Sequence, residues 1–157
     1  MHSDITVVLK NVVEQFSSFL TVHDLVEDCD KEDIVGLLRY LSERIPSDVN
    51  GCLRNHSSVM ISAAWYRTKY AGKLTEANRN ASQAYSKHYL GYRERAYNEW
   101  TAKTMAESQQ DVVAWSCHKD RLQSLVSCFE TLLEVAKQRL SILEQLSNNY
   151  RVEVRNS

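Results

Sequence analysis

Apolar residues recur every three or four positions along most of this chain, which is the spacing of the buried face of an α-helix. The pattern predicts a first helix over residues 4–22 and a second helix over residues 31–45. Asp30 is placed to cap the second helix, and Pro46 stops it because the residue before a proline disfavours the α conformation. These two short helices form an N-terminal helical hairpin.

The third predicted helix is much longer and spans residues 49–103, about 80 Å if it is continuous. Ser47 or Asp48 can cap its first turn. Gly72 and Gly91 are its weak points, since a glycine costs about 1 kcal/mol relative to alanine inside a helix. We therefore expect a kink or a break near Gly91.

The fourth predicted helix spans residues 108–148, and its apolar residues follow a spacing close to a heptad repeat. Two helices of this length carry more apolar surface than the short hairpin can cover, so we expect a homo-oligomer. The tail over residues 151–157 is expected to fray. The predicted oligomerisation contacts are Trp115, Leu122, Leu125, Phe129, Leu132, Leu140 and Leu143.

Composition favours an all-α class, because the 157 residues include one proline and four glycines and therefore few tight turns. We predict a short N-terminal helical hairpin followed by two long helices, which form a coiled-coil-like helical hairpin or an oligomeric bundle. No apolar run approaches the roughly 18 residues of a membrane span, and the N-terminus lacks a cleavable signal. A cytoplasmic protein with no membrane association is expected.

The charge of the chain is almost balanced at −1, but it is unevenly distributed. Residues 1–50 carry four basic and ten acidic side chains, whereas residues 51–105 carry nine basic and three acidic ones. This split predicts an acidic N-terminal hairpin over residues 1–46 and a basic long-helix body over residues 47–157. The hairpin is expected to lie outside the core, where it either competes with a ligand of the basic body or faces a protein partner.

The basic charge is concentrated between Trp65 and Trp100, where seven lysines or arginines are interspersed with six tyrosines. Cations neutralise phosphates and flat rings stack on unpaired bases, so this composition favours a single-stranded nucleic acid. In an alternative interpretation the tyrosines, which recur every three or four residues, form a buried helix stripe. The predicted nucleic-acid contacts are Lys69, Lys73, Lys87, Tyr89, Tyr92, Arg93, Arg95 and Tyr97.

Catalytic signatures are absent from the sequence, which has no phosphate-binding glycine loop, no nucleophile elbow and no zinc-protease helix. We therefore expect neither an enzyme nor a cofactor. Cys52 with His56 and Cys117 with His118 could supply zinc ligands, but reduced core thiols and a hydrogen-bonded histidine are the simpler interpretation. The six carboxylates of residues 24–33 are interpreted as a solvated acidic segment.

The second half of the chain contains several short motifs: Arg93 and Arg95 followed by Tyr97, Asp111 followed by Val112, an apolar ladder of Leu122, Leu125, Phe129 and Leu133, and Lys137 and Arg139 followed by Ile142. Together these motifs, between residues 55 and 153, resemble the recombination mediator proteins of T-even-type bacteriophages. That family opens its last long helix with an acidic Asp-Val motif, carries Lys-x-Arg followed by Ile near the end of this helix, and places a basic pair before tyrosines on a DNA-contacting segment. A second adjacent tyrosine is missing here, and residues 1–46 have no counterpart.

The resemblance implies a helical, non-catalytic oligomer that binds single-stranded DNA without sequence preference. It also implies two protein partners, because the family helps to load a RecA-like recombinase onto DNA that is coated by single-strand-binding protein. The residues of this chain leave a second hypothesis open. In that alternative the chain is a helical protein-interaction module or inhibitor that acts through the acidic hairpin or the coiled-coil seam.

Overall fold

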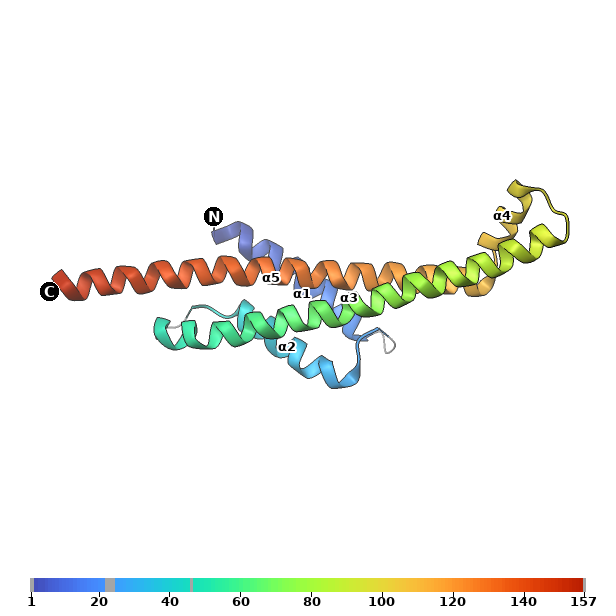
Figure 1. Ribbon diagram of the computed structural model, residues 1–157. Helices are drawn as coiled ribbons and strands as arrows, with labels where there is room; N and C mark the ends of the chain where they lie inside the picture. Colours follow the sequence, from blue (N-terminus) through green and yellow to red (C-terminus); the bar gives the residue numbers. More distant parts are fainter. Residues whose placement is uncertain (1, 22–24, 46, 157) are drawn as a thin grey trace. The chain divides into compact units, whose positions relative to one another are not determined.

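The computed structural model describes residues 2–21, 25–45 and 47–156, and within these ranges every helix or strand assigned is an α-helix (Figure 1). The predicted all-α class with two long helices is therefore confirmed. None of the helices in these ranges is both long and apolar enough to cross a membrane. The helices are α1 (His2–Thr21), α2 (Asp28–Ser42), α3 (Val49–Glu94), α4 (Glu99–Glu107) and α5 (Gln110–Asn156).

Two compact units make up the chain, and the long helices α3 and α5 contribute to both of them. Unit 1 comprises Met1–Arg67 and Ser127–Ser157, and unit 2 comprises Thr68–Val126. This grouping differs from the division predicted at Pro46, a residue that lies outside the described ranges, as do Val22 and Asp24. The helices of the N-terminal hairpin belong to the same unit as the start of α3 and the end of α5.

The core of unit 1 is organised around Phe129 of α5, whose side chain is fully buried. Its ring meets the ring of Phe16 of α1 edge to face, with 5.0 Å between centroids, and stacks on Tyr66 of α3 at 6.1 Å. The expectation that the hairpin lies outside the core is wrong, because the apolar faces of α1 and α2 are buried in it. Those faces consist of Leu9, Val12 and Phe16 in α1 and Ile34, Leu37, Leu38 and Leu41 in α2.

A polar network occupies the part of this core where α2, α3 and α5 meet. His56 is fully buried; its Nε2 donates to the carbonyl of Ala136 at 2.7 Å, and its Nδ1 accepts from the hydroxyl of Tyr40 at 3.0 Å. A carbonyl can only accept, which places the proton of the neutral ring on Nε2. Arg139 lies over the Tyr40 ring at 4.8 Å and donates to the carbonyl of Glu43 at 2.7 Å, at the C-terminal end of α2. The prediction of a hydrogen-bonded core histidine is confirmed.

The starts of α2 and α3 show one predicted cap that is wrong and one that is right. Glu27 occupies the capping position of α2, so Asp30 lies in the first helical turn, where the helix dipole favours acidic residues. The carboxylate of Asp48 accepts the backbone N–H of Gly51 at 2.9 Å and caps α3. A side chain at Gly51 would collide with this carboxylate, so the glycine permits the cap.

The long helix predicted over residues 49–103 is interrupted, and the interruption follows Glu94, whereas Gly91 stays within α3. Ala96 adopts a left-handed backbone conformation with φ of 62°. Asn98 then caps α4, because its side-chain oxygen accepts the backbone N–H of Thr101 at 2.8 Å. The break expected near Gly91 is therefore present, and it begins three residues after that glycine, beyond Glu94.

Unit 2 buries a core in which small side chains allow helices to approach closely. The buried apolar residues of unit 2 are Tyr70, Ala77, Ala102, Ala106, Val112, Leu122, Leu125 and Val126.

The C-terminal end of α5 belongs to unit 1, and there the helix continues to Asn156. The fraying predicted for residues 151–157 is therefore wrong over the described part of this tail. The side chains of residues 151–156 are all exposed.

Candidate nucleic-acid interface

The turn between α3 and α4 is closed by hydrogen bonds and by a ring contact. The N–H of Ala96 donates to the carbonyl of Arg93 at 3.0 Å, and the N–H of Tyr97 donates to the carbonyl of Tyr92 at 3.3 Å. These are the two hydrogen bonds of a Schellman motif, and the accompanying apolar contact is made by the Tyr92 and Tyr97 rings, edge to face at 5.9 Å. The Arg93 guanidinium adds a hydrogen bond to the Tyr97 carbonyl at 3.0 Å. The turn is therefore fixed although alanine occupies the position where glycine is usual.

Two aromatic rings and two cations are exposed around this turn. Tyr97 is 41% exposed, and Trp100 in the first turn of α4 is 74% exposed. Arg95 is exposed in the turn, and the exposed Lys103 lies about one helical turn after Trp100 on α4. Rings beside cations on an open surface are the combination that binds a single strand through stacking and phosphate contacts.

Trp100 and Lys103 are functional candidates that were absent from the predicted contacts. The spacing of Trp100 from Ala96 fits the tyrosine stripe, so the sequence pattern places it on a buried face. The signal that could have identified it is Asn98, since asparagine is a preferred cap and indicates that a new helix starts after it.

The predicted stacking tyrosines have different degrees of burial. Tyr89 is half-buried and stacks on Tyr85, one helical turn earlier, with 5.8 Å between ring centroids. Tyr92 is half-buried, and its hydroxyl accepts a hydrogen bond from the side-chain amide of Gln109 at 2.8 Å. The buried-stripe interpretation therefore describes these tyrosines better, whereas Tyr97 is open to a base.

The predicted cations do not form one cluster. Lys69 and Lys73 are half-buried, and their Nζ atoms lie 6.0 and 5.4 Å from the ring centroid of the buried Tyr70. Lys87 is exposed, as is Arg93. Lys73 and Arg93 are about 30 Å apart along α3, because each helical residue advances about 1.5 Å. The structure thus gathers only the second half of the predicted set near the α3–α4 turn.

Asp111, which belongs to the Asp-Val motif of the family resemblance, links α5 to α3 within unit 2. Its carboxylate oxygens lie 2.9 and 3.0 Å from Nε2 of His88, and one of them accepts the N–H of Val112 at 3.0 Å. The hydrogen bond from His88 is the main reason why the pKa of Asp111 lies below its ordinary value. Asp111 therefore has a structural partner in this chain.

Most of the predicted oligomerisation contacts are buried inside the single chain. Trp115 and Leu140 are half-buried. Exposed apolar residues of α5 lie instead near its C-terminus, outside the predicted set, where Leu146, Tyr150 and Val154 recur every four residues. The fully covered residues of the predicted set are Leu122, Leu125, Phe129, Leu132 and Leu143.

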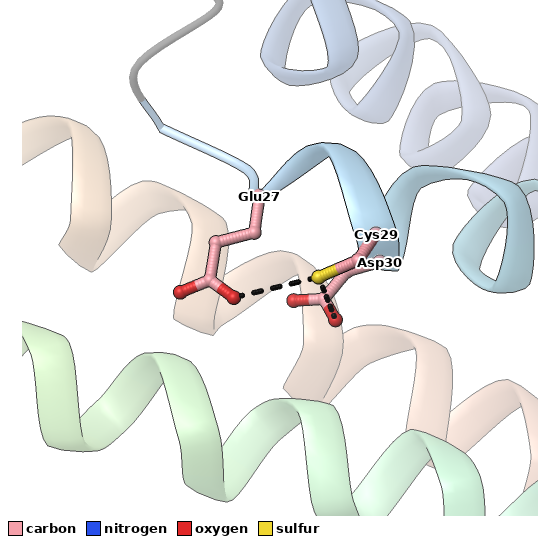
Figure 2. A group of neighbouring side chains, drawn as sticks. All are labelled: Glu27, Cys29 and Asp30. Atoms are coloured by element: carbon pink, nitrogen blue, oxygen red, sulfur yellow. Dashed lines mark hydrogen bonds between the residues drawn. The ribbon is translucent and has the colours of Figure 1, made fainter.

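The acidic segment at the start of α2 brings three possible metal ligands together. Ligand atoms of Glu27, Cys29 and Asp30 lie within 4.8 Å of one another (Figure 2). The Cys29 thiol donates to the Glu27 and Asp30 carboxylates, with 3.7 Å from sulfur to each oxygen. Glu27 and Cys29 are exposed, and such acidic groups are common without an ion, so this cluster alone does not define a metal site.

A pocket of about 360 Å³ lies beside this cluster, between α2 and α3 of unit 1. The hydroxyl of Tyr66 donates to the carboxylate of Asp33 at 2.7 Å and joins its two walls. Ile61 is 71% exposed and Trp65 is 55% exposed, one helical turn apart on α3. No sequence pattern predicts this pocket, whose lining is Cys29, Asp30 and Asp33 from α2 and Ile61, Ser62, Trp65 and Tyr66 from α3.

Comparison of the chain with protein-family models, with curated proteins and with solved structures finds no match. The resemblance to phage recombination mediators therefore stays a prediction that its short motifs carry.

Proposed function

We propose that this chain is a non-catalytic helical protein that binds single-stranded DNA and acts as a recombination mediator. The observation that carries the proposal is the exposure of Tyr97 and Trp100 beside Arg95 and Lys103 at the α3–α4 turn. Exposed rings of this kind stack on bases of any sequence, and the neighbouring cations hold the backbone phosphates. The RecA-like recombinase and the single-strand-binding protein are partners that the resemblance alone implies.

The exposed cations in and beside the α3–α4 turn limit the electrostatic part of binding at this surface. Lys87, Arg93, Arg95 and Lys103 can neutralise at most four phosphates. For a single strand each phosphate contributes about 0.7 to the slope of log affinity against log salt, so the slope should be no steeper than about −3. Each stacked ring adds about 1–3 kcal/mol, which makes stacking at Trp100 and Tyr97 a comparably large part of the affinity.

Binding to a labelled oligo-dT at several salt concentrations tests the proposal. The double variant R95A/K103A should bind more weakly and flatten the salt slope by about 1.4, because it loses two phosphate contacts. The control is R44A/R54A, which removes two exposed arginines of unit 1 and should leave the slope unchanged. An unchanged slope in R95A/K103A, with helicity preserved, would move the site away from the α3–α4 turn.

We also propose that the protein is a homo-oligomer, assembled through the C-terminal part of α5. Leu146, Tyr150 and Val154 form an exposed apolar stripe, and a helix with such a stripe is stabilised when a second helix covers it. Light scattering should detect an oligomer at micromolar concentration, and Y150D should reduce it to monomers because the interface would bury an unpaired charge. A stable wild-type monomer at that concentration would contradict this part of the proposal.

A protein-interaction module that acts through the acidic hairpin is the second candidate function. The pocket between α2 and α3 favours it, because Asp30 and Asp33 line a cavity that also exposes Trp65 and Ile61. A negatively lined pocket does not suit a phosphate backbone. Absence of oligo-dT binding by the folded chain would leave this candidate as the better account.

A further inference from the structure

We propose that the single strand bound at the α3–α4 turn continues along the exposed face of α3 as far as Arg79, so that the site takes a strand of up to about eight nucleotides. The inference rests on the proposed function and specifies the length of its ligand and the path that this ligand follows. It adds Arg79, Gln83 and Ser86 to the contacts at the turn.

Charge distinguishes the two helices that meet at the turn. From residue 77 to residue 93, α3 carries three cations and no carboxylate, whereas α4 carries two carboxylates and one cation. A phosphate backbone that leaves the turn is therefore attracted to α3 and not to α4. The cations of this part of α3 are Arg79, Lys87 and Arg93, the stretch is bounded by Glu76 and Glu94, and the charged residues of α4 are Glu99, Lys103 and Glu107.

The cations of α3 are accessible from one side of the helix. Arg79, Lys87 and Arg93 are exposed, and on an ideal helix they fall within an arc of about 120°. In the part of the chain that the structure describes, Arg79 and Lys87 form no ion pair. Their charges are therefore not neutralised within the chain and can neutralise phosphates of a ligand.

The side chains between these cations suit a nucleic-acid strand. Gln83, Ser86 and Leu90 lie within the same arc, and all three are exposed. Amide and hydroxyl side chains donate hydrogen bonds to phosphate oxygens, so Gln83 and Ser86 can hold the backbone between two cations. Leu90 is 58% exposed and offers an apolar contact to a base, which gives this side chain a ligand on an otherwise polar face.

The length of this face determines the length of the strand. Arg79 and Arg93 are fourteen residues apart, about 21 Å along the helix axis. With phosphates about 3.4 Å apart, as in one strand of a duplex, this distance accommodates at most about six nucleotides. Tyr97 and Trp100 can stack two further bases, which gives up to about eight, within the range of roughly 4–16 nucleotides that one single-strand-binding module covers.

The test is fluorescence anisotropy of labelled oligo-dT of four and of twelve nucleotides with the full chain and its Arg79→Ala variant. The 4-mer can occupy the turn alone, whereas the 12-mer is long enough to reach Arg79. Arg79→Ala should bind the 4-mer like the wild type and the 12-mer more weakly. Its slope of log affinity against log salt for the 12-mer should be flatter by about 0.7, because one phosphate contact is lost. A fourfold rise in salt should therefore narrow the difference in 12-mer affinity by about 2.6-fold.

Arg121→Ala is the matched control, because it removes an exposed arginine of α5 in the same unit. His88 pairs with Asp111 across the antiparallel helices α3 and α5, which places Arg121 about level with Arg79. Arg121→Ala should leave the affinity for both oligonucleotides unchanged. Gln83→Glu keeps a good helix former but places a carboxylate on the path, so it should weaken the 12-mer and not the 4-mer.

Equal weakening of the 12-mer by Arg79→Ala and Arg121→Ala would overturn the path along α3, as would a 12-mer affinity that neither Arg79→Ala nor Gln83→Glu changes. Trp100→Ala, measured with the 4-mer, tests the turn separately. A loss in Trp100→Ala together with an unaffected Arg79→Ala would overturn this inference alone, whereas failure of the wild type to bind either oligonucleotide would overturn the proposed function as well.

Discussion

Replacement of Phe129 by alanine should lower the free energy of unfolding of the single chain. Replacement of a residue in a subunit interface would instead dissociate an oligomer. Phe129 is fully buried, and its ring contacts Phe16 of α1 and Tyr66 of α3. Truncation of a buried phenylalanine costs about 3–5 kcal/mol through lost burial and the cavity left behind. The edge-to-face pair with Phe16 accounts for about 0.5–1.5 kcal/mol of this loss. The total is a large fraction of a stability of about 5–15 kcal/mol.

The assay is urea unfolding of the wild type, F16A, F129A and the double variant, followed by circular dichroism at two protein concentrations about a hundredfold apart. The coupling energy between Phe16 and Phe129 should be about 0.5–1.5 kcal/mol. The loss in F129A should be the same at both concentrations, because the contact lies within one chain. Folded F129A monomers, with no coupling to Phe16, would refute the reasoning and return Phe129 to a subunit interface.

The polar network, the end of α3 and the thiols each predict a measurable outcome. Burial is the main cause that lowers the pKa of His56 below its ordinary value of 6.5. The neutral His56 ring makes its full contribution to the free energy of unfolding above pH 6.5. This contribution is lost as the pH falls below 6.5, by at most about 1.4 kcal/mol per pH unit, because the unfolded chain then binds a proton that the buried ring resists. Urea unfolding of His56→Gln should therefore show a shallower loss of stability in acid, and an unchanged acid dependence would contradict this. Ala96→Gly should raise the free energy of unfolding by about 1 kcal/mol, measured by thermal melting, because glycine adopts a φ of 62° without steric cost. A lower melting temperature would show that the turn is not strained. Burial raises the pKa of Cys128 to about 11. Iodoacetamide near pH 8 should therefore label the exposed Cys29 and Cys117 first, and Cys128 only on unfolding. Rapid labelling of Cys128 in the native protein, detected by mass spectrometry, would contradict its burial.

The helical pattern alone was sufficient to predict the class of the fold and most of the buried faces. Leu9, Val12 and Phe16, spaced three and four residues apart in the first predicted helix, share a buried face, because apolar periodicity reports a shared face wherever the helix is continuous. The same rule misplaced Trp100, because the spacing of residues in the sequence stays regular across a break in the helix, whereas the faces of the two helices do not. The left-handed residue is Ala96, so no glycine marks the turn itself, although Gly91 indicated a break three residues before the helix ends.

The parts of the candidate sites that depend on distant residues could not be predicted locally. The pocket is lined by residues of α2 and α3, and the hydrogen bond from Tyr66 of α3 to Asp33 of α2 joins its walls, a contact that only the packing of the two helices creates. Burial of Phe129 likewise depends on α1, which a helix pattern cannot place against α5. The apolar surface of the long helices exceeds what a short hairpin can cover, but α1 of the hairpin covers the part of α5 around Phe129.

Fluorescence anisotropy of a labelled oligo-dT with the variants Trp100→Ala and Trp65→Ala tests the proposed single-strand interface most directly. Both substitutions remove an exposed tryptophan of a helix, one at the α3–α4 turn and the other in unit 1. Trp100→Ala should weaken binding roughly 5- to 150-fold, which corresponds to about 1–3 kcal/mol for one stacked base, and should leave the salt slope unchanged. Trp65→Ala should bind like the wild type. Unchanged affinity in folded Trp100→Ala, or equal losses in both variants, would contradict the account.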